Sequence, residues 1–246
     1  MTDNNTAQCI GSLPPNKAIG VRRLFPRFVF LTYLLSNPVC PAIGQNQPPQ
    51  TQPDPPIVRY IEKLFFYNSR QADILFIGDS LLAAMPREVS NEIAGGQTLR
   101  NFAVPGAQTK DVLWLLRDPR LKSEMPNRVI LLIGTNDIFH HHSARETADG
   151  VLAVVARVQA IWPQARIMIL TMPKFLQPAP TSTERDRANE LILRRARRSN
   201  DEQVLDISRQ LVCTPNDCNN FREDKLHFNS AGYVILRDLI LQQLKS

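Results

Sequence analysis

The segment Ile74-Leu75-Phe76-Ile77-Gly78-Asp79-Ser80-Leu81 decides the fold of this 246-residue chain. A short apolar run that ends at Gly78 is typical of a buried strand in a parallel sheet. We expect a sharp turn after this strand and a helix that begins near Leu81. Ser80 would then lie at a helix N-terminus, where backbone amides point outward and favour developing negative charge.

The same pattern continues along the chain from Ile57 onward, because short apolar runs alternate with longer amphipathic segments. Such alternation is typical of βα units around a parallel sheet. The expected strands cover residues 74–78, 99–104, 128–134, 166–172 and 203–207. Apolar residues at three- and four-residue steps predict a helix over about 144–162, which Pro163 ends, and a last helix capped by Asn229 or Ser230. The predicted fold class is α/β, in a single domain over residues 57–246.

The chain before this domain is interpreted as a leader followed by a spacer. Basic residues up to Arg27, an apolar run over 28–35 and small residues at 42–44 predict a signal peptide over residues 1–44, cleaved after Gly44. The apolar run is far shorter than the roughly 20 residues of a spanning helix, so we expect no stable membrane span. Several prolines among polar residues predict an extended linker over 45–56. This organisation indicates an extracytoplasmic protein, periplasmic or secreted; a disordered cytosolic tail is the alternative.

Charge and cysteine content limit the function classes. The net charge is +6, of which residues 1–44 contribute +4 − 1 = +3, leaving a mild +3 for the rest. That is too weak to indicate nucleic-acid binding, which needs a concentrated basic surface. Cys213 and Cys218 lie in a loop-like stretch five positions apart. They can close a small disulfide ring, as exported proteins often do, or remain two free thiols.

Polar motifs follow several of the predicted strands. Ser80 follows the first strand, Gly106 the second, and Gly134-Thr135-Asn136-Asp137 the third, while Asp224-Lys225-Leu226-His227 precedes the last helix. In an open parallel sheet, ligands bind outside the carboxyl ends of the strands. These positions are therefore expected to converge on one crevice.

The residue types at this crevice suit acyl transfer. The hydroxyl of Ser80 becomes a useful nucleophile when His227 takes its proton, and Asp224 can hold the imidazole by accepting from Nδ1. The Asn136 side chain and the amides of Ser80 and Gly106 can donate to an oxyanion. Read singly, Ser80 is equally an N-cap, Gly106 a turn glycine, and the 134–137 motif a strand-ending turn.

Other polar residues near these motifs are given supporting roles. Asp79 is expected to bond nearby backbone amides in the turn, and Gly134 and Asp137 belong to the supporting set with it. The run His140–His142 is expected to face solvent, because three consecutive imidazoles rarely bind one ion. One predicted helix is rich in arginines, which we interpret as a solvated face. They are Arg185, Arg187, Arg194, Arg195, Arg197 and Arg198.

Taken together, these strings resemble the SGNH/GDSL hydrolases over about residues 73–244. Ser80 matches the nucleophile of the first family block, Gly106 and Asn136 the oxyanion donors of the second and third, and Asp224 with His227 the last block. Asn101-Phe102, Asp111 to Trp114 and Gly134 to Asn136 are similar to the catalytic subunits of platelet-activating-factor acetylhydrolase. The resemblance implies a three-layer α/β/α sandwich, flavodoxin-like with a five-stranded parallel sheet, and no metal or other cofactor.

The resemblance implies a serine esterase that hydrolyses short acyl esters through an acyl-enzyme. The expected substrates are small-molecule esters, lipids or acylated glycans. A polysaccharide O-acetyltransferase with the same three residues is an alternative, as is a non-catalytic carbohydrate- or lipid-binding module. The residues do not predict acyl-chain length or oligomeric state. Pro105 and Ala107 beside the oxyanion glycine, and Phe228 after the histidine, depart from the usual family pattern and leave substrate preference open.

Overall fold

The computed structural model describes residues 54–66, 71–196 and 202–245. The predicted signal peptide and most of the predicted linker lie outside these ranges and stay predictions. The first helix, α1 (Pro55–Phe66), takes in the last two residues of that linker, Pro55 and Pro56. The prediction of extended structure is wrong for these two residues. Proline is favoured in the first turn of a helix, where its missing N–H would have no intrahelical acceptor.

Five parallel strands form one sheet. They are β1 (Ile74–Gly78), β2 (Leu99–Asn101), β3 (Arg128–Leu132), β4 (Arg166–Leu170) and β5 (Glu202–Leu205). Their order is β2-β1-β3-β4-β5, which is the flavodoxin-like order. All of β1 is buried, as expected for a strand covered on both faces. The predicted fold class is confirmed, and the strand predicted over 74–78 is confirmed at both ends.

The second predicted strand is too long because a side chain interrupts the ladder. The amide of Ala103 donates to Asn101 Oδ1 at 2.9 Å, and β2 ends at Asn101. The amide of Val104 still donates to Gly78 O at 2.9 Å. The chain therefore continues beside the end of β1 and carries the Gly106 loop toward Ser80.

The strands β3, β4 and β5 also end earlier than predicted. Gly134 adopts φ 118° and turns the chain from β3 into α5 (Thr135–Phe139). After β4, the amide of Met172 donates to Asn189 Oδ1 at 2.9 Å. After β5, Asp206 caps the 3-10 helix η2 (Ile207–Arg209) by accepting from Ser208 N at 3.2 Å.

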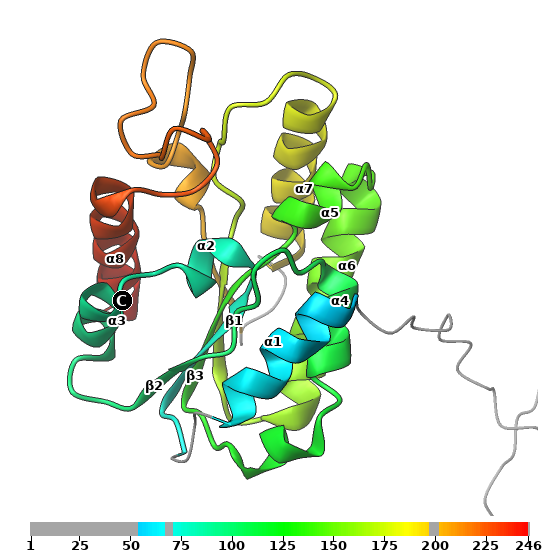
Figure 1. The fold of residues 1–246 in the computed structure, drawn as a ribbon, viewed down its shortest axis with the longest axis vertical. Coiled ribbons are helices and arrows are strands. Elements are labelled where there is room, and N and C mark those ends of the chain that lie inside the picture. Colours follow the sequence, from blue (N-terminus) through cyan, green and yellow to red (C-terminus); the bar gives the residue numbers. More distant parts are fainter. Residues whose placement is uncertain (1–53, 67–70, 197–201, 246) are drawn as a thin grey trace, which may run out of the picture. The chain divides into compact units, whose positions relative to one another are not determined.

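Helices cover both faces of the sheet and make three layers (Figure 1). Leu75 and Ile77 of β1 join one core, whereas Ile74 and Phe76 join the other, so both faces are packed with apolar side chains. On the first face lie α1, α4 (Thr109–Leu115), α6 (Ala144–Ile161) and α7 (Thr181–Ala196), and on the second lie α3 (Arg87–Ala94) and α8 (Ser230–Leu244). A further 3-10 helix, η1 (Pro119–Ser123), precedes β3.

The two predicted helices have capped N-termini. Ser143 Oγ accepts from the amide of Glu146 at 3.3 Å, so α6 begins at Ala144 as predicted, and Trp162 is its C-cap. Of the two candidate caps of α8, the structure uses Asn229, whose Oδ1 accepts from Gly232 N at 3.1 Å. This cap sets the start of α8 shortly after His227. Within the described ranges, no helix has the length and apolar character to cross a bilayer.

Candidate active site

Ser80 is the first residue of the short helix α2 (Ser80–Ala83), directly after β1. Gly78 is needed here, because a Cβ at this position would meet the backbone carbonyl of Leu132 in β3. Asp79 is the N-cap, and its Oδ1 accepts from Leu81 N at 3.0 Å. Because Asp79 caps the helix, the hydroxyl of Ser80 is available for another partner.

That partner is His227. Its Nε2 lies 2.9 Å from Ser80 Oγ, and its Nδ1 lies 2.7 Å from Asp224 Oδ2. With Asp224 ionised, Nδ1 donates to the carboxylate and Nε2 is left to accept from the serine hydroxyl. The structure thus joins residues 147 positions apart in one hydrogen-bonded chain at the carboxyl edge of the sheet.

The loop around Asp224 holds its carboxylate in place. Oδ1 accepts from the amides of Leu226 at 3.0 Å and His227 at 2.9 Å, while Oδ2 faces the imidazole. Lys225 has φ 60°, and this left-handed residue directs the two following amides back toward Asp224. Partial burial opposes ionisation, but hydrogen bonds from His227 and Leu226 outweigh it and lower the pKa of Asp224 to about 2. Asp224 is therefore ionised at neutral pH.

The second and third motifs are joined to each other. Gly106 has φ 77° and is exposed. Asn136 lies in the first turn of α5, and its Nδ2 donates to Ala107 O at 2.9 Å. One N–H of the Asn136 amide is used in this bond and the other points elsewhere, since a primary amide has two donors. The bond fixes Asn136 beside the Gly106 loop.

The supporting residues hold the surrounding elements. Burial disfavours the charged form of Asp79 and raises its pKa to about 7, against the opposing effect of the Leu81 amide. Asp137 accepts from Thr109 Oγ1 at 2.5 Å and from Thr109 N at 3.0 Å, which ties α5 to α4. Burial also raises the pKa of Asp137. Gly134 turns the chain into α5, so these residues shape the site without joining the Ser80–His227–Asp224 chain.

Two side chains that hold α2 by hydrogen bonds are not predicted by the sequence analysis. Asn101 Nδ2 donates to Leu82 O at 2.8 Å, and Tyr233 Oη donates to Leu81 O at 3.1 Å. Tyr233 belongs to the first turn of α8, so it ties the serine-bearing helix to the helix that follows His227. Asn101 was noted only as part of a resemblance, and nothing in the local sequence around Tyr233 marks its hydroxyl as a partner of α2.

The arginine-rich helix is only partly a solvated face. Arg187, Arg194 and Arg195 are largely solvent-facing, and Arg197 and Arg198 lie outside the described residues. Arg185 is buried, and the prediction is wrong for it. Its Nη1 donates to Phe175 O at 2.6 Å, and its guanidinium lies 4.8 Å from the Phe175 ring centroid. A buried backbone carbonyl and an aromatic face together compensate part of the lost hydration.

The histidine run follows α5. His140 and His141 are exposed, and His142 Nδ1 lies 3.6 Å from Asp137 Oδ1. Among the side chains that the structure describes, no group of three or more His, Cys, Asp or Glu residues is placed to hold a metal ion.

A parallel sheet covered on both faces, with a serine, an imidazole and a carboxylate hydrogen-bonded at its carboxyl edge, is the arrangement expected of an SGNH hydrolase. Residues 76–235 match the GDSL-like Lipase/Acylhydrolase family. Subunit alpha2 of platelet-activating factor acetylhydrolase IB from Rattus norvegicus is 30% identical over 184 residues, which cover 72% of this chain and 79% of that subunit. Subunit alpha1 from the same organism is 33% identical over 125 residues, which cover 50% of this chain and 53% of that subunit.

Solved structures share the fold. A GDSL-like lipase from Bacteroides thetaiotaomicron superimposes with a TM-score of 0.62 at 17% identity, covering 77% of this chain and 97% of that one. A variant of an acetyl-xylooligosaccharide esterase from Geobacillus Stearmophilus has a TM-score of 0.56 at 16% identity, covering 71% and 94%. The chain belongs to the GDSL-like Lipase/Acylhydrolase family, which confirms the predicted resemblance and makes it a carboxylic ester hydrolase.

Proposed function

We propose that the protein is a serine esterase that hydrolyses esters of short acyl groups, with Ser80 as nucleophile, His227 as base and Asp224 as its orienting partner. The observation that carries this proposal is the pair of hydrogen bonds of His227, at 2.9 Å to Ser80 Oγ and at 2.7 Å to Asp224 Oδ2. The first distance is within the range expected of a nucleophile and its base, and the second is within hydrogen-bond distance of a group that orients the base.

The reaction runs in two halves. Ser80 Oγ attacks the ester carbonyl carbon while His227 Nε2 takes the hydroxyl proton, and a tetrahedral oxyanion forms. The imidazolium then gives this proton to the leaving alkoxide as the ester C–O bond breaks, which leaves an acyl-enzyme on Ser80. A water molecule repeats the sequence in the second half and releases the carboxylic acid. Asp224 stays ionised throughout and stabilises the imidazolium.

Three donors are proposed for the oxyanion: the amides of Ser80 and Gly106 and the second N–H of Asn136. Ser80 N lies at the start of α2, where an amide has no intrahelical acceptor. Within the described ranges, neither the Ser80 amide nor the Gly106 amide donates to a protein acceptor. Donors held in place before the reaction stabilise charge as it develops, and one such donor contributes a factor of roughly 10² to 10³.

The proposed substrates are small-molecule esters with acetyl or similarly short acyl groups, carried by a lipid or a glycan. The support is the likeness to an acetylhydrolase subunit over most of its length. Export to an oxidising compartment is proposed as well, because the leader has the pattern of a signal peptide and the structure joins Cys213 and Cys218 in a disulfide. N-terminal sequencing of the purified protein tests export, and an intact Met1 would contradict it.

The test of catalysis is Ser80→Ala. We expect it to lower turnover of p-nitrophenyl acetate by up to about 10⁶, the loss seen in well-studied triads, and to abolish labelling by a fluorophosphonate. Ser90→Ala is the matched control, because this serine lies on α3 and donates to Pro86 O at 3.1 Å. Turnover by Ser80→Ala equal to that of the control would refute the proposal. Faster transfer of acetate to an added glycan than to water would assign the same residues to an acyltransferase.

A further inference from the structure

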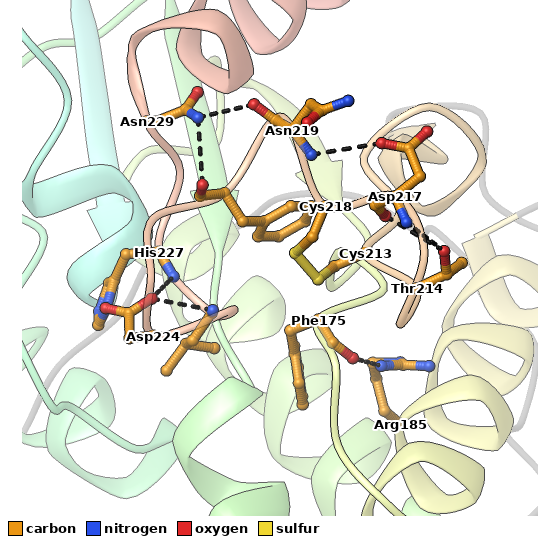
Figure 2. Close-up of a disulfide and its surroundings, with 12 residues drawn as sticks. Phe175, Arg185, Cys213, Thr214, Asp217, Cys218, Asn219, Asp224, His227 and Asn229 are labelled. Carbon is orange, nitrogen blue, oxygen red and sulfur yellow. Dashed lines mark hydrogen bonds and ion pairs between the residues drawn. A yellow bond between two sulfur atoms is a disulfide. The ribbon is translucent and has the colours of Figure 1, made fainter.

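A disulfide lies next to the loop that carries Asp224 and His227. Cys213 and Cys218 are joined, and both pack in the apolar cluster that contains Phe228, the residue after His227 (Figure 2). Backbone hydrogen bonds connect Cys213 to the segment after β4, and they connect Cys218 to the loop of Asp224 and His227.

The Cys213 side is attached to the segment after β4. Cys213 N donates to Lys174 O at 2.7 Å, and Lys174 N donates to Leu211 O at 2.9 Å. Lys174 and Val212 form a parallel bridge. The chain at Cys213 is therefore held by the segment that follows a central strand of the sheet.

The Cys218 side leads directly into the loop of Asp224 and His227. Phe221 N donates to Cys218 O at 3.1 Å, and Phe221 and Phe228 form an antiparallel bridge. Arg222 N donates to His227 O at 2.7 Å. Residues 221–222 and 227–228 thus form the two sides of the loop, and its base begins shortly after Cys218.

Asn229 also holds the two ends of the loop that carries Asp224 and His227. Its Nδ2 donates to Asn219 O at 2.7 Å (Figure 2) and to Phe221 O at 3.1 Å. Its Oδ1 caps α8. One side chain therefore connects the residue after Cys218, the base of the loop and the helix that follows it. These bonds connect Cys218 to the backbone of His227 through Asn219, Phe221 and Arg222.

Between the two cysteines, little besides the disulfide closes the ring. Residues 214–217 are exposed, and three hydrogen bonds between Thr214 and Asp217 cross the ring. Thr214 N donates to Asp217 O at 2.8 Å, Thr214 Oγ1 donates to the same oxygen at 3.2 Å, and Asp217 N donates to Thr214 Oγ1 at 3.0 Å. Exposed hydrogen bonds of this kind contribute little net free energy in water. The disulfide is the strong link between the anchored Cys213 and the chain that continues from Cys218 into the loop.

We propose that the Cys213–Cys218 disulfide is a positioning element of the active site, which keeps His227 Nε2 within hydrogen-bond distance of Ser80 Oγ. The inference rests on the proposed function. A second tie, from Leu176 N to Lys225 O at 3.1 Å, also holds the loop. Loss of the disulfide therefore misplaces His227 without releasing it. A displacement of about 1 Å in a reacting group can cost roughly 10²-fold in rate, so we expect turnover to fall by about ten- to a hundredfold.

The experiment uses the full chain with Cys213→Ala and Cys218→Ala combined. Hydrolysis of p-nitrophenyl acetate and the rate of fluorophosphonate labelling are measured at a temperature where circular dichroism shows wild type and variant to be folded. We expect a lower kcat and slower labelling with KM within about twofold of wild type, since proton transfer and not substrate binding is affected. Asn216→Ala is the matched control, because it changes an exposed residue of the ring and keeps the disulfide.

Reduction tests the same link without mutation. Dithiothreitol gives two electrons and two protons to the disulfide, which becomes two thiols, and is itself oxidised to a cyclic disulfide. Treated wild type should fall to the activity of the double variant and recover on reoxidation. The double variant should not respond, which controls for Cys9 and Cys40.

Three results would overturn the proposal. One is wild-type kcat in the folded double variant or in reduced wild type whose thiols are trapped by alkylation. Another is a change in KM alone. The last is loss of the native circular dichroism spectrum in both forms, because the disulfide would then hold the whole domain and not the loop. Activity that persists in Ser80→Ala would instead refute the proposed function, so the two failures are distinguishable.

Discussion

Replacement of Asp79 by asparagine should raise the free energy of unfolding relative to wild type as pH rises. The Asp79 side chain is fully buried at the end of β1, and burial raises its pKa from 3.8 to about 7. Asparagine keeps an oxygen that can accept from Leu81 N, as Oδ1 now does at 3.0 Å. The substitution therefore removes the ionisable group while it preserves the cap of α2.

The sign follows from proton linkage. Below pH 3.8, Asp79 is protonated in both the folded and the unfolded chain, and it adds no pH dependence. Between pH 3.8 and about 7 the unfolded chain releases the proton while the folded protein keeps it, so the free energy of unfolding falls as pH rises. The free energy of unfolding falls by about 1.4 kcal/mol for each pH unit in this window. Above the window, burial of the Asp79 carboxylate lowers the free energy of unfolding by roughly 4 kcal/mol in total. The Asp79→Asn variant does not carry this cost.

Equilibrium unfolding in urea at about pH 4, 6 and 8, followed by tryptophan fluorescence, measures the effect. We expect the difference in unfolding free energy between Asp79→Asn and wild type to grow by a few kcal/mol from the lowest to the highest of these pH values. Asp149→Asn is the control, because it removes an exposed carboxylate from α6. An Asp79→Asn difference that is the same at both ends of this range would show that the folded protein ionises Asp79 without penalty, and the argument from burial would be wrong.

Two further substitutions test the site. Asp224→Asn removes the acceptor that orients His227 Nδ1 and should lower kcat by on the order of 10⁴, as the equivalent change does in serine proteases; a p-nitrophenyl acetate rate within about tenfold of wild type at neutral pH would contradict the proposed role. Tyr233→Phe removes the bond from Oη to Leu81 O at 3.1 Å and leaves a buried carbonyl without that donor. It should lower the free energy of unfolding by about 1 to 3 kcal/mol, and an unchanged urea midpoint would show that the bond contributes nothing.

The positions of the strands could be predicted because each is a short apolar run between polar turns, but the carboxyl ends of β2, β3, β4 and β5 could not. A run of apolar residues does not show where a backbone amide donates to a side-chain oxygen and not to the neighbouring strand. At Ala103 the acceptor is Asn101 Oδ1, and at Met172 it is Asn189 Oδ1 from a helix 17 residues later. The second acceptor belongs to α7, and the sequence around Met172 does not show how that helix packs.

A local sequence pattern also does not show which charged side chain is buried. Arg185 belongs to a helix whose composition indicates a solvated face, and its exposed neighbours agree with that prediction. It pairs with the adjacent Asp186, and its buried partner, Phe175 O, lies in the preceding loop. The spacing of Cys213 and Cys218 likewise allows a disulfide ring without requiring one, and only the path of the backbone brings the two side chains together.

The two halves of the proposed reaction centre differ in how the fold supports them, which explains why they differ in predictability. Ser80 follows a fully buried strand, and its helix is held by Asn101 and Tyr233 from two sides. Asp224 and His227 lie on an irregular loop, with side chains 47% and 26% exposed. Parallel strand ends converge by construction, so Ser80 could be placed from the apolar pattern alone. Placement of His227 depends on the backbone hydrogen bonds of one loop. A change that leaves the sheet intact can therefore still separate the His227 imidazole from the Ser80 hydroxyl.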